Sequence, residues 1–427
     1  MNNMDNIKEK LYTKTLKDGL KVYIYKKIGF SEKIALFGTK YGSINNHFND
    51  INTDQEIIVP DGVAHFLEHK LFEQEGANAL DLFSKIGVSA NAYTSFDQTV
   101  FYFETIQRFN ESLALLIKLV KTPYFTDKNV EKEQGIIGQE INMYNDDSGY
   151  MAYFNALKAM YIKNPVNIDI AGSIESISKI NKDVLYSCYN TFYYPSNMFL
   201  IVIGDVDIDD TINCIEQNLR LYEHDYDRIS EVKNVKKYFV EEPKNINKKY
   251  SDNKMEVYMP ELCIGYKLDV VQKEEIIKNE VISQIISEMY FSKLSNFYKT
   301  EYENKVISSE IEFDGEFTNS FAHVIISAST TNVDKLKEDI LEYIEKIKVE
   351  DVDNNLFELV KRRLIGADIL DFDDLNSIYR RIIDSILTET DLYEPEKILN
   401  ALTSKDIKRF LNNLKSEKQV VSIIRPE

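Results

Sequence analysis

The sequence predicts an α+β fold of two duplicated domains, each a mainly antiparallel sheet packed against helices. Three observations lead to this prediction. The chain has 427 residues, which is too many for one ordinary hydrophobic core. Strand-like and helix-like segments follow one another in a similar order in the two halves. Short local similarities between the halves also recur at nearly constant spacing.

Apolar residues that alternate with polar ones indicate strands, and apolar residues at helical spacing indicate amphipathic helices. In the first half, the predicted strands are 20–25, 34–41, 88–93, 99–106 and 199–204. The predicted helices there are one that carries residues 65–69 and those at 79–86, 110–121, 127–144 and 182–191. In the second half, the predicted strands are 262–268, 306–313, 320–328 and 419–424. The predicted helices there are 274–298, 333–348, 352–369 and 404–414.

The local similarities support a true duplication. They pair Ile137–Ile141 with Ile365–Ile369, Phe96–Asp97 with Phe313–Asp314, and Lys182–Asp183 with Lys405–Asp406. The charged stretch 222–253 is the predicted linker. We expect a catalytic, zinc-binding domain in residues 1–225 and a homologous domain without metal in residues 226–427, because the long predicted helix of the second half carries no histidine.

The composition limits which binding partners and which cellular compartment we expect for the protein. The net charge of −19 disfavours nucleic acid and anionic membranes as partners. It is compatible with basic peptide substrates, but the simpler interpretation, which we prefer, is that the acidity keeps the protein soluble. No apolar run is long enough to span a membrane. Cys188, Cys214 and Cys263 lack the spacing of a metal or redox motif, which predicts reduced thiols and a cytoplasmic protein.

Two of only five histidines lie four residues apart on a predicted helix, with a glutamate between them. Because residues i and i+4 share one helical face, His65 and His69 can bind the same cation. Zinc accepts two imidazoles and takes a third protein ligand, with a fourth position left for water. Glu68 is then the candidate base that takes the proton of this water. The alternative is a surface cluster held by ordinary helix pairing.

The third ligand is expected to be a carboxylate from another helix. Glu140 is the candidate, and Glu133 lies two turns before it on the same helical face, flanked by isoleucines. Without the histidine motif, the favoured interpretation of both glutamates is that they are exposed helix residues, so this prediction depends on the motif.

These motifs resemble the pitrilysin/insulinase family (M16) of inverted zinc peptidases, which includes the mitochondrial processing peptidases, and most of all its YmfH-like bacterial branch. The resemblance covers essentially the whole chain. It is carried by the stretches Gly62–Glu73, Ser89–Thr94, Glu133–Glu140 and Asn190–Met198 and by the duplicated half. The fold it implies is the one that LuxS and the mitochondrial processing peptidases (MPP) share.

The resemblance implies a role for each motif residue. His65, His69 and Glu140 would hold zinc, Glu68 would activate water, and Glu133 would assist catalysis. The residues Asn91, Ala92, Tyr93 and Thr94 would form an edge strand to which an extended peptide substrate adds, through main-chain hydrogen bonds that tolerate many sequences.

One departure from the family concerns the second half. The family normally supplies an arginine there and, seven residues on, a tyrosine, and these two grip the substrate backbone. Here Tyr298 and Lys305 stand near those positions, and no arginine occurs between Leu268 and Phe313. We therefore expect a partner chain to supply the missing groups. A heterodimer with a metal-less homologous subunit is the first expectation, and a homodimer is the alternative.

Three functions compete at this point. The leading one is a zinc metalloendopeptidase that cuts peptides or unfolded segments enclosed in a chamber. The second is a non-catalytic or regulatory subunit of a peptidase complex, although such subunits usually have a broken metal motif. The third is a metal-dependent amide hydrolase of another fold, which the Asn91 strand and the duplication disfavour.

Overall fold

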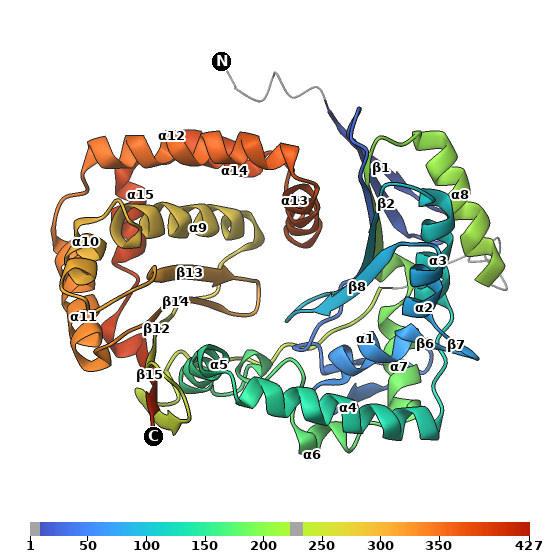
Figure 1. Cartoon of the computed structure of the whole chain (residues 1–427), viewed down its shortest axis with the longest axis horizontal. Coiled ribbons are helices and arrows are strands. Elements are labelled where there is room, and N and C mark those ends of the chain that lie inside the picture. Colours follow the sequence, from blue (N-terminus) through green and yellow to red (C-terminus); the bar gives the residue numbers. More distant parts are fainter. Residues whose placement is uncertain (1–8, 223–233) are drawn as a thin grey trace. The chain divides into compact units, whose positions relative to one another are not determined.

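The computed structural model describes residues 9–222 and 234–427, in two compact units (Figure 1). Unit 1 takes the described residues of Met1–Ile141, Asp169–Phe239 and Asp374–Ile382. Unit 2 takes Asn142–Ile168, Val240–Asp373 and Ile383–Glu427. The expected domain boundary at residues 225 and 226 lies outside the described residues.

Unit 1 is built on a six-stranded sheet in the order β1-β2-β10-β3-β9-β8. The strands of this sheet are β1 (Leu11–Thr15), β2 (Lys21–Lys26), β3 (Lys33–Thr39), β8 (Ser89–Thr94), β9 (Thr99–Thr105) and β10 (Met198–Gly204). Short pairs are formed by β4 (His47–Asn49) with β5 (Glu56–Ile58), and by β6 (Glu73–Gln74) with β7 (Ala77–Asn78). The helices are α1 (Val63–Phe72), α2 (Ala79–Lys85), α3 (Phe109–Lys121), α4 (Asp127–Asn145), α6 (Ile174–Ile177), α7 (Lys182–Phe192) and α8 (Ile208–Tyr222).

Burial explains the positions of the strands in this sheet. Every residue of β10 is buried, as expected of a central strand covered on both faces. Strand β8 is only half-buried and pairs on one side alone, with β9. Among the described residues its other side is an open edge. Helices α1 and α2 pack against β8, and α3 packs against β3 and β9.

Unit 2 is built on a five-stranded sheet in the order β11-β15-β12-β14-β13. Its strands are β11 (Tyr250–Met255), β12 (Glu261–Lys267), β13 (Glu312–Phe317), β14 (Ala322–Ser329) and β15 (Gln419–Pro426). Its helices are α5 (Ser148–Met160), α9 (Lys273–Ile286), α10 (Asn296–Glu303), α11 (Val333–Val349), α12 (Asn354–Leu370), α14 (Glu394–Ala401) and α15 (Ser404–Leu411). The helix α13 (Leu375–Thr388) begins in unit 1 and ends in unit 2.

The two sheets repeat one topology. In each, a central strand from the C-terminal end of its half (β10 or β15) lies parallel to one neighbour (β2 or β11). The same strand lies antiparallel to its other neighbour (β3 or β12), and two further antiparallel strands follow outward. The predicted duplicated α+β fold is therefore confirmed, with β13 in the place of β8.

Two predicted elements of the second half are wrong. The helix predicted over 274–298 is interrupted: α9 ends at Ile286, a π-helical turn follows over Ser287–Phe291, and α10 begins at Asn296. The interruption falls where the Ser295 side chain accepts a hydrogen bond from Tyr298 N at 3.0 Å, because serine favours helix caps over helix interiors. The strand predicted over 306–313 begins only at Glu312.

Candidate metal centre

Helix α1 begins at a glycine that no other residue could replace without strain. Gly62 has φ +89°, and a Cβ there would come within 2.5 Å of the carbonyl oxygen of Ala171. Phe66, Leu67 and Leu71 are fully buried in unit 1. Since α1 packs against β8 and β9 through such apolar side chains, the polar residues of the motif lie on another face of the helix.

The carboxylates come from α4. Ile137 and Ile141 are buried on this helix, which fixes its rotation about its own axis. Glu133 and Glu140 then face α1, at the two ends of one helical stripe. The structure thus brings together His65, His69 and Glu140, three residues that the sequence proposed as ligands.

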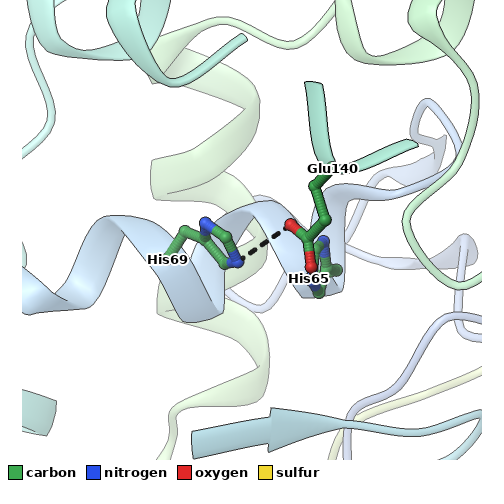
Figure 2. Close-up of side chains that lie close together, drawn as sticks. All are labelled: His65, His69 and Glu140. Carbon is green, nitrogen blue, oxygen red and sulfur yellow. Dashed lines mark ion pairs between the residues drawn. The ribbon is translucent and has the colours of Figure 1, made fainter. Parts of the chain in front are cut away.

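Their ligand atoms converge (Figure 2). Nε2 of His65 lies 3.7 Å from Oε1 of Glu140, and Nε2 of His69 lies 3.4 Å from Oε2 of the same carboxylate. One potential ligand atom from each residue lies within 4.8 Å of those of the other two. His65 is 8% exposed, so the group is sheltered and still reachable.

This donor set fits zinc. Catalytic zinc sites use three protein ligands from histidine and glutamate and keep the fourth position open. Ligand atoms about 2.1 Å from a tetrahedral ion lie about 3.4 Å from one another, close to the separations found here. Within the described parts of the chain, this is the one group of histidine, cysteine, aspartate and glutamate side chains that meets the spacing of a metal site.

Glu133 contacts the far side of the His69 ring. Its Oε1 lies 3.2 Å from His69 Nδ1. Because an ionised carboxylate only accepts hydrogen bonds, Nδ1 carries a proton. The surrounding carboxylates raise the pKa of His69, and in the neutral imidazole that binds a metal Nε2 is the nitrogen left with a lone pair toward Glu140. A carboxylate that orients a ligating histidine in this way is a common support of metal sites. The structure thus places Glu133 next to the imidazole of His69.

Lys70 is a member of the site that the sequence analysis missed. Its side chain is fully buried, and its ammonium lies 3.3 Å from Oε2 of Glu133 and also contacts Glu73. The two oxygens of Glu133 are therefore divided between a histidine and a lysine. A partial signal was present in the sequence, since a lysine in the last turn of a mainly apolar helix with a glutamate three residues on predicts an ion pair with that glutamate, here Glu73.

The pKa shifts follow from burial and from these contacts. Burial and the neighbouring His69 lower the pKa of His65 to about 4, so His65 is neutral at pH 7 and able to bind a cation. Burial also raises the pKa of Glu68, which suits a group that must take up a proton. Burial alone would raise the pKa of Glu133, but hydrogen bonds from His69 and Lys70 outweigh it, and its pKa is lowered.

The predicted substrate strand, Asn91 to Thr94, lies at the open edge of the sheet in β8. The Ala92 N–H bonds the side-chain oxygen of its neighbour Asn91 at 2.8 Å, so it points away from β9. At the end of the strand, the Thr94 hydroxyl donates to Oε2 of Glu68 at 2.6 Å. One strand, β8, thus provides the open edge of the sheet and also contacts α1, the metal helix that carries His65 and His69.

Sequence comparison assigns the chain to a known family. The model "Insulinase (Peptidase family M16)" matches residues 59–173, and the model "Peptidase M16 inactive domain" matches residues 179–364. The protein named "Uncharacterized zinc protease YmfH" from Bacillus subtilis (strain 168) is 36% identical over 95% of this chain and 94% of its own length. The chain belongs to peptidase family M16.

Solved M16 structures share the fold over almost the whole chain. An M16-like peptidase from Alicyclobacillus acidocaldarius superposes with a TM-score of 0.92 at 28% identity, covering 98% of this chain and 99% of that one. A peptidase M16 inactive domain from Pseudomonas fluorescens gives a TM-score of 0.77 at 15% identity, covering 98% of each chain. None of the described helices has the length and apolar character needed to cross a membrane.

Proposed function

We propose that this chain is a zinc metalloendopeptidase that hydrolyses peptide bonds of peptides or unfolded segments enclosed in a chamber. The observation that carries the proposal is the convergence of His65, His69 and Glu140, with Glu68 beside them and the open edge of β8 leading to Glu68. Two of the relatives that support it carry the name zinc protease.

In this proposal His65, His69 and Glu140 hold zinc. The ion would polarise the scissile carbonyl and lower the pKa of the attacking water. Glu68 takes the proton from the water and passes it to the leaving amine, a role that its raised pKa favours. Glu133 holds His69 in the tautomer that leaves Nε2 free.

The substrate binds as an added strand on β8. An N–H on the open edge, such as that of Ala92, would pair with the peptide backbone after the Asn91 side chain has moved aside. Since Asn91, Ala92, Tyr93 and Thr94 offer mainly backbone groups to the peptide, cleavage should tolerate many sequences. An extended peptide is required, which excludes folded proteins.

Two measurements test this function. Zinc analysis of the purified protein should give one ion per chain in the wild type and none in His65→Ala. Glu68→Gln should retain zinc while kcat falls at least about a hundredfold, because only the proton acceptor is lost. Glu131→Gln, on the exposed face of α4, serves as the control with normal activity. Normal cleavage by Glu68→Gln would remove Glu68 from the mechanism.

The second candidate is a non-catalytic or regulatory subunit of a peptidase complex. It is favoured by the match of residues 179–364 to the inactive-domain model. The same zinc and Glu68→Gln measurements decide between the two candidates, because a regulatory subunit would lack turnover in the wild type as well.

We further propose that the chain works with a metal-less homologous subunit, or alternatively as a homodimer. Tyr298, which stands where the family has an arginine, is 7% exposed and packs in the core of unit 2, so it cannot reach a substrate. Lys305 lies two residues after the end of helix α10, in the turn, with φ +58°. Co-purification from the native source should yield the second subunit. Full peptidase activity of the chain alone at high dilution would contradict the proposal.

A further inference from the structure

The segment Asp374–Ile382 comes from the second half of the sequence but belongs to unit 1. Its contact with the first sheet is made by tyrosines: the ring of Tyr379 lies 6.3 Å from that of Tyr102 on β9, between centroids. Leu375, Ile378 and Ile382 are buried on the same segment. Arg380, the residue after Tyr379, is exposed.

The face of the sheet that this segment covers can be deduced from the strand register. Tyr102 pairs with Asn91 of β8, so its side chain lies on the same face as those of Asn91 and Tyr93. Ala92 and Thr94 point to the opposite face, where Thr94 meets Glu68 of α1. Tyr379 and Arg380 therefore lie on the face of β8 and β9 that does not carry the metal helix.

A substrate strand added to β8 has the same alternation. Its residue opposite Ala92 points to the α1 face, and the residues on either side of it point to the Tyr93 face. Thr94 contacts Glu68, so Glu68 lies beside the end of β8. Thr94 is two residues from Ala92, which is about 7 Å along the strand at ~3.3 Å per residue. A substrate side chain on the Tyr93 face is thus within about two residues of the bond that is cut.

Arg380 has the chemistry to bind such a side chain. In the described chain no carboxylate lies within 4 Å of its guanidinium, although the protein carries 70 acidic residues against 51 basic ones. The one acid on its own segment, Asp374, accepts hydrogen bonds from the N–H and the hydroxyl of Ser377 and makes no ion pair with Arg380, although its charge acts on the guanidinium from a longer distance. The pKa of Arg380 is raised, chiefly by the phenol of Tyr379 and further by Tyr93 of β8 and by Asp374, so the guanidinium lies within electrostatic range of the edge strand.

We propose that Arg380 is a specificity-determining residue that binds a carboxylate of the peptide substrate on the Tyr93 face of β8. A guanidinium is the side chain best suited to a carboxylate, since its planar fork matches the two oxygens. The proposal rests on the proposed peptidase function and names its substrate class: peptides with an aspartate or glutamate near the cleaved bond. A free C-terminal carboxylate close to that bond would offer the same chemistry.

The test uses the full-length, zinc-loaded protein with any subunit that co-purifies. Peptides are compared in pairs that differ by glutamate or glutamine within two residues of the cleaved bond, each made with a free or an amidated C-terminus. The wild type should cleave the glutamate peptide with a kcat/KM about tenfold higher. Arg380→Gln should lose this preference, and Arg380→Lys should keep part of it. Arg362→Gln, an exposed arginine of α12, should behave like the wild type.

A second readout separates this proposal from the peptidase function itself. Binding of the same fluorescent peptides is measured by anisotropy on Glu68→Gln, with and without Arg380→Gln. If Glu68→Gln binds the acidic peptide more tightly and the added Arg380→Gln substitution abolishes this preference, the result supports the carboxylate site at Arg380 even when no peptide is cleaved. Where the preference follows the terminal carboxylate instead, the site binds the end of the peptide. Cleavage with no preference for either carboxylate overturns the assignment of Arg380 and leaves the peptidase function standing. Binding with no preference, and with no cleavage by the wild type, overturns both. Absence of both cleavage and binding overturns both.

Discussion

The hydroxyl of Thr94 donates a hydrogen bond of 2.6 Å to Oε2 of Glu68. Thr94 is the last residue of the edge strand β8, and Glu68 lies in the middle of α1. This one contact joins the strand that would bind substrate to the group that would take the proton. It also opposes the effect of burial on Glu68, since a hydrogen bond to the charged form lowers a carboxyl pKa.

Thr94→Val should therefore reduce kcat while zinc content is unchanged. Valine keeps the branched shape of threonine and removes only the hydroxyl, so the expected loss is about 10- to 100-fold, as for other residues that orient a catalytic group. Steady-state kinetics with metal analysis check this. Thr105→Val, at the far end of the neighbouring strand β9, is the control. Unchanged kcat in Thr94→Val would show that the hydroxyl does not orient Glu68.

The open edge of β8 gives a second prediction. The Ala92 N–H does not take part in the ladder with β9, so proline at this position removes no strand hydrogen bond. It does remove a donor to an added strand. Ala92→Pro should raise KM about five- to tenfold with little change in the unfolding free energy, the loss expected for about one backbone hydrogen bond. Ala92→Ser, which keeps the N–H, should retain the wild-type KM. Equal KM values for the two variants would contradict substrate addition at this edge.

Lys70 gives a third prediction. Its ammonium is fully buried between Glu133 and Glu73, so Lys70→Met leaves the charge of Glu133 uncompensated in the interior. Breaking such a pair costs about 3–5 kcal/mol of unfolding free energy. Because Glu133 also orients His69, zinc affinity should fall about 10- to 100-fold in chelator competition.

The matched control for Lys70→Met is Lys132→Met on α4, which is exposed and lies one residue before Glu133. It should change neither the unfolding free energy nor the zinc affinity. If Lys70→Met unfolds at the wild-type denaturant concentration, the ion pair with Glu133 is not part of the support of the site.

Much of the first unit could be predicted from sequence, because its strands carry strong apolar patterns. The patterns of the fully apolar β10 and of the alternating β8 predict the bounds of both strands to within one residue. The second half was harder. The apolar residues of 274–298 continue at helical spacing through a break that depends on the cap made by Ser295. The spacing of apolar residues contains no information about such caps, so it could not predict the break.

The site was predictable where chemistry and spacing coincide, and not where it depends on tertiary contacts. His65, His69 and Glu140 could be proposed because zinc demands specific residue types. The contact of Lys70 with Glu133 bridges two helices far apart in the sequence. The packing of Tyr379 on Tyr102 likewise joins residues from the two halves of the sequence. Contacts of this kind depend on the fold and leave no local pattern.

Glu242, in the second part of the predicted linker 222–253, is held in unit 2 by a buried ion pair. The ammonium of Lys267 lies 2.5 Å from Oε1 of Glu242 and also donates to the carbonyl oxygens of Met160, Pro243 and Asn245. Glu242 accepts three backbone N–H groups, from residues 162–164. The pKa of Lys267 is lowered by its burial even though Glu242 is near. A lowered lysine pKa means that the folded state disfavours the charged ammonium. We therefore expect the ionisation of Glu242, and not that of Lys267, to stabilise the fold.

Glu242→Gln should destabilise unit 2, by about 3–5 kcal/mol, because it leaves the buried Lys267 charge without its partner. Burial alone would raise the pKa of Glu242, but the hydrogen bonds from Lys267 and the three N–H groups lower it. A carboxyl with a lowered pKa in the folded state stabilises the fold above its unfolded pKa of about 4.3, and this contribution is lost as the pH falls through the folded value. In denaturant unfolding, the difference between wild type and Glu242→Gln should therefore be full at pH 7 and shrink below about pH 4. A difference that stays constant down to pH 3 would mean that the charge of Glu242 contributes nothing, and that the glutamine simply fits the position poorly.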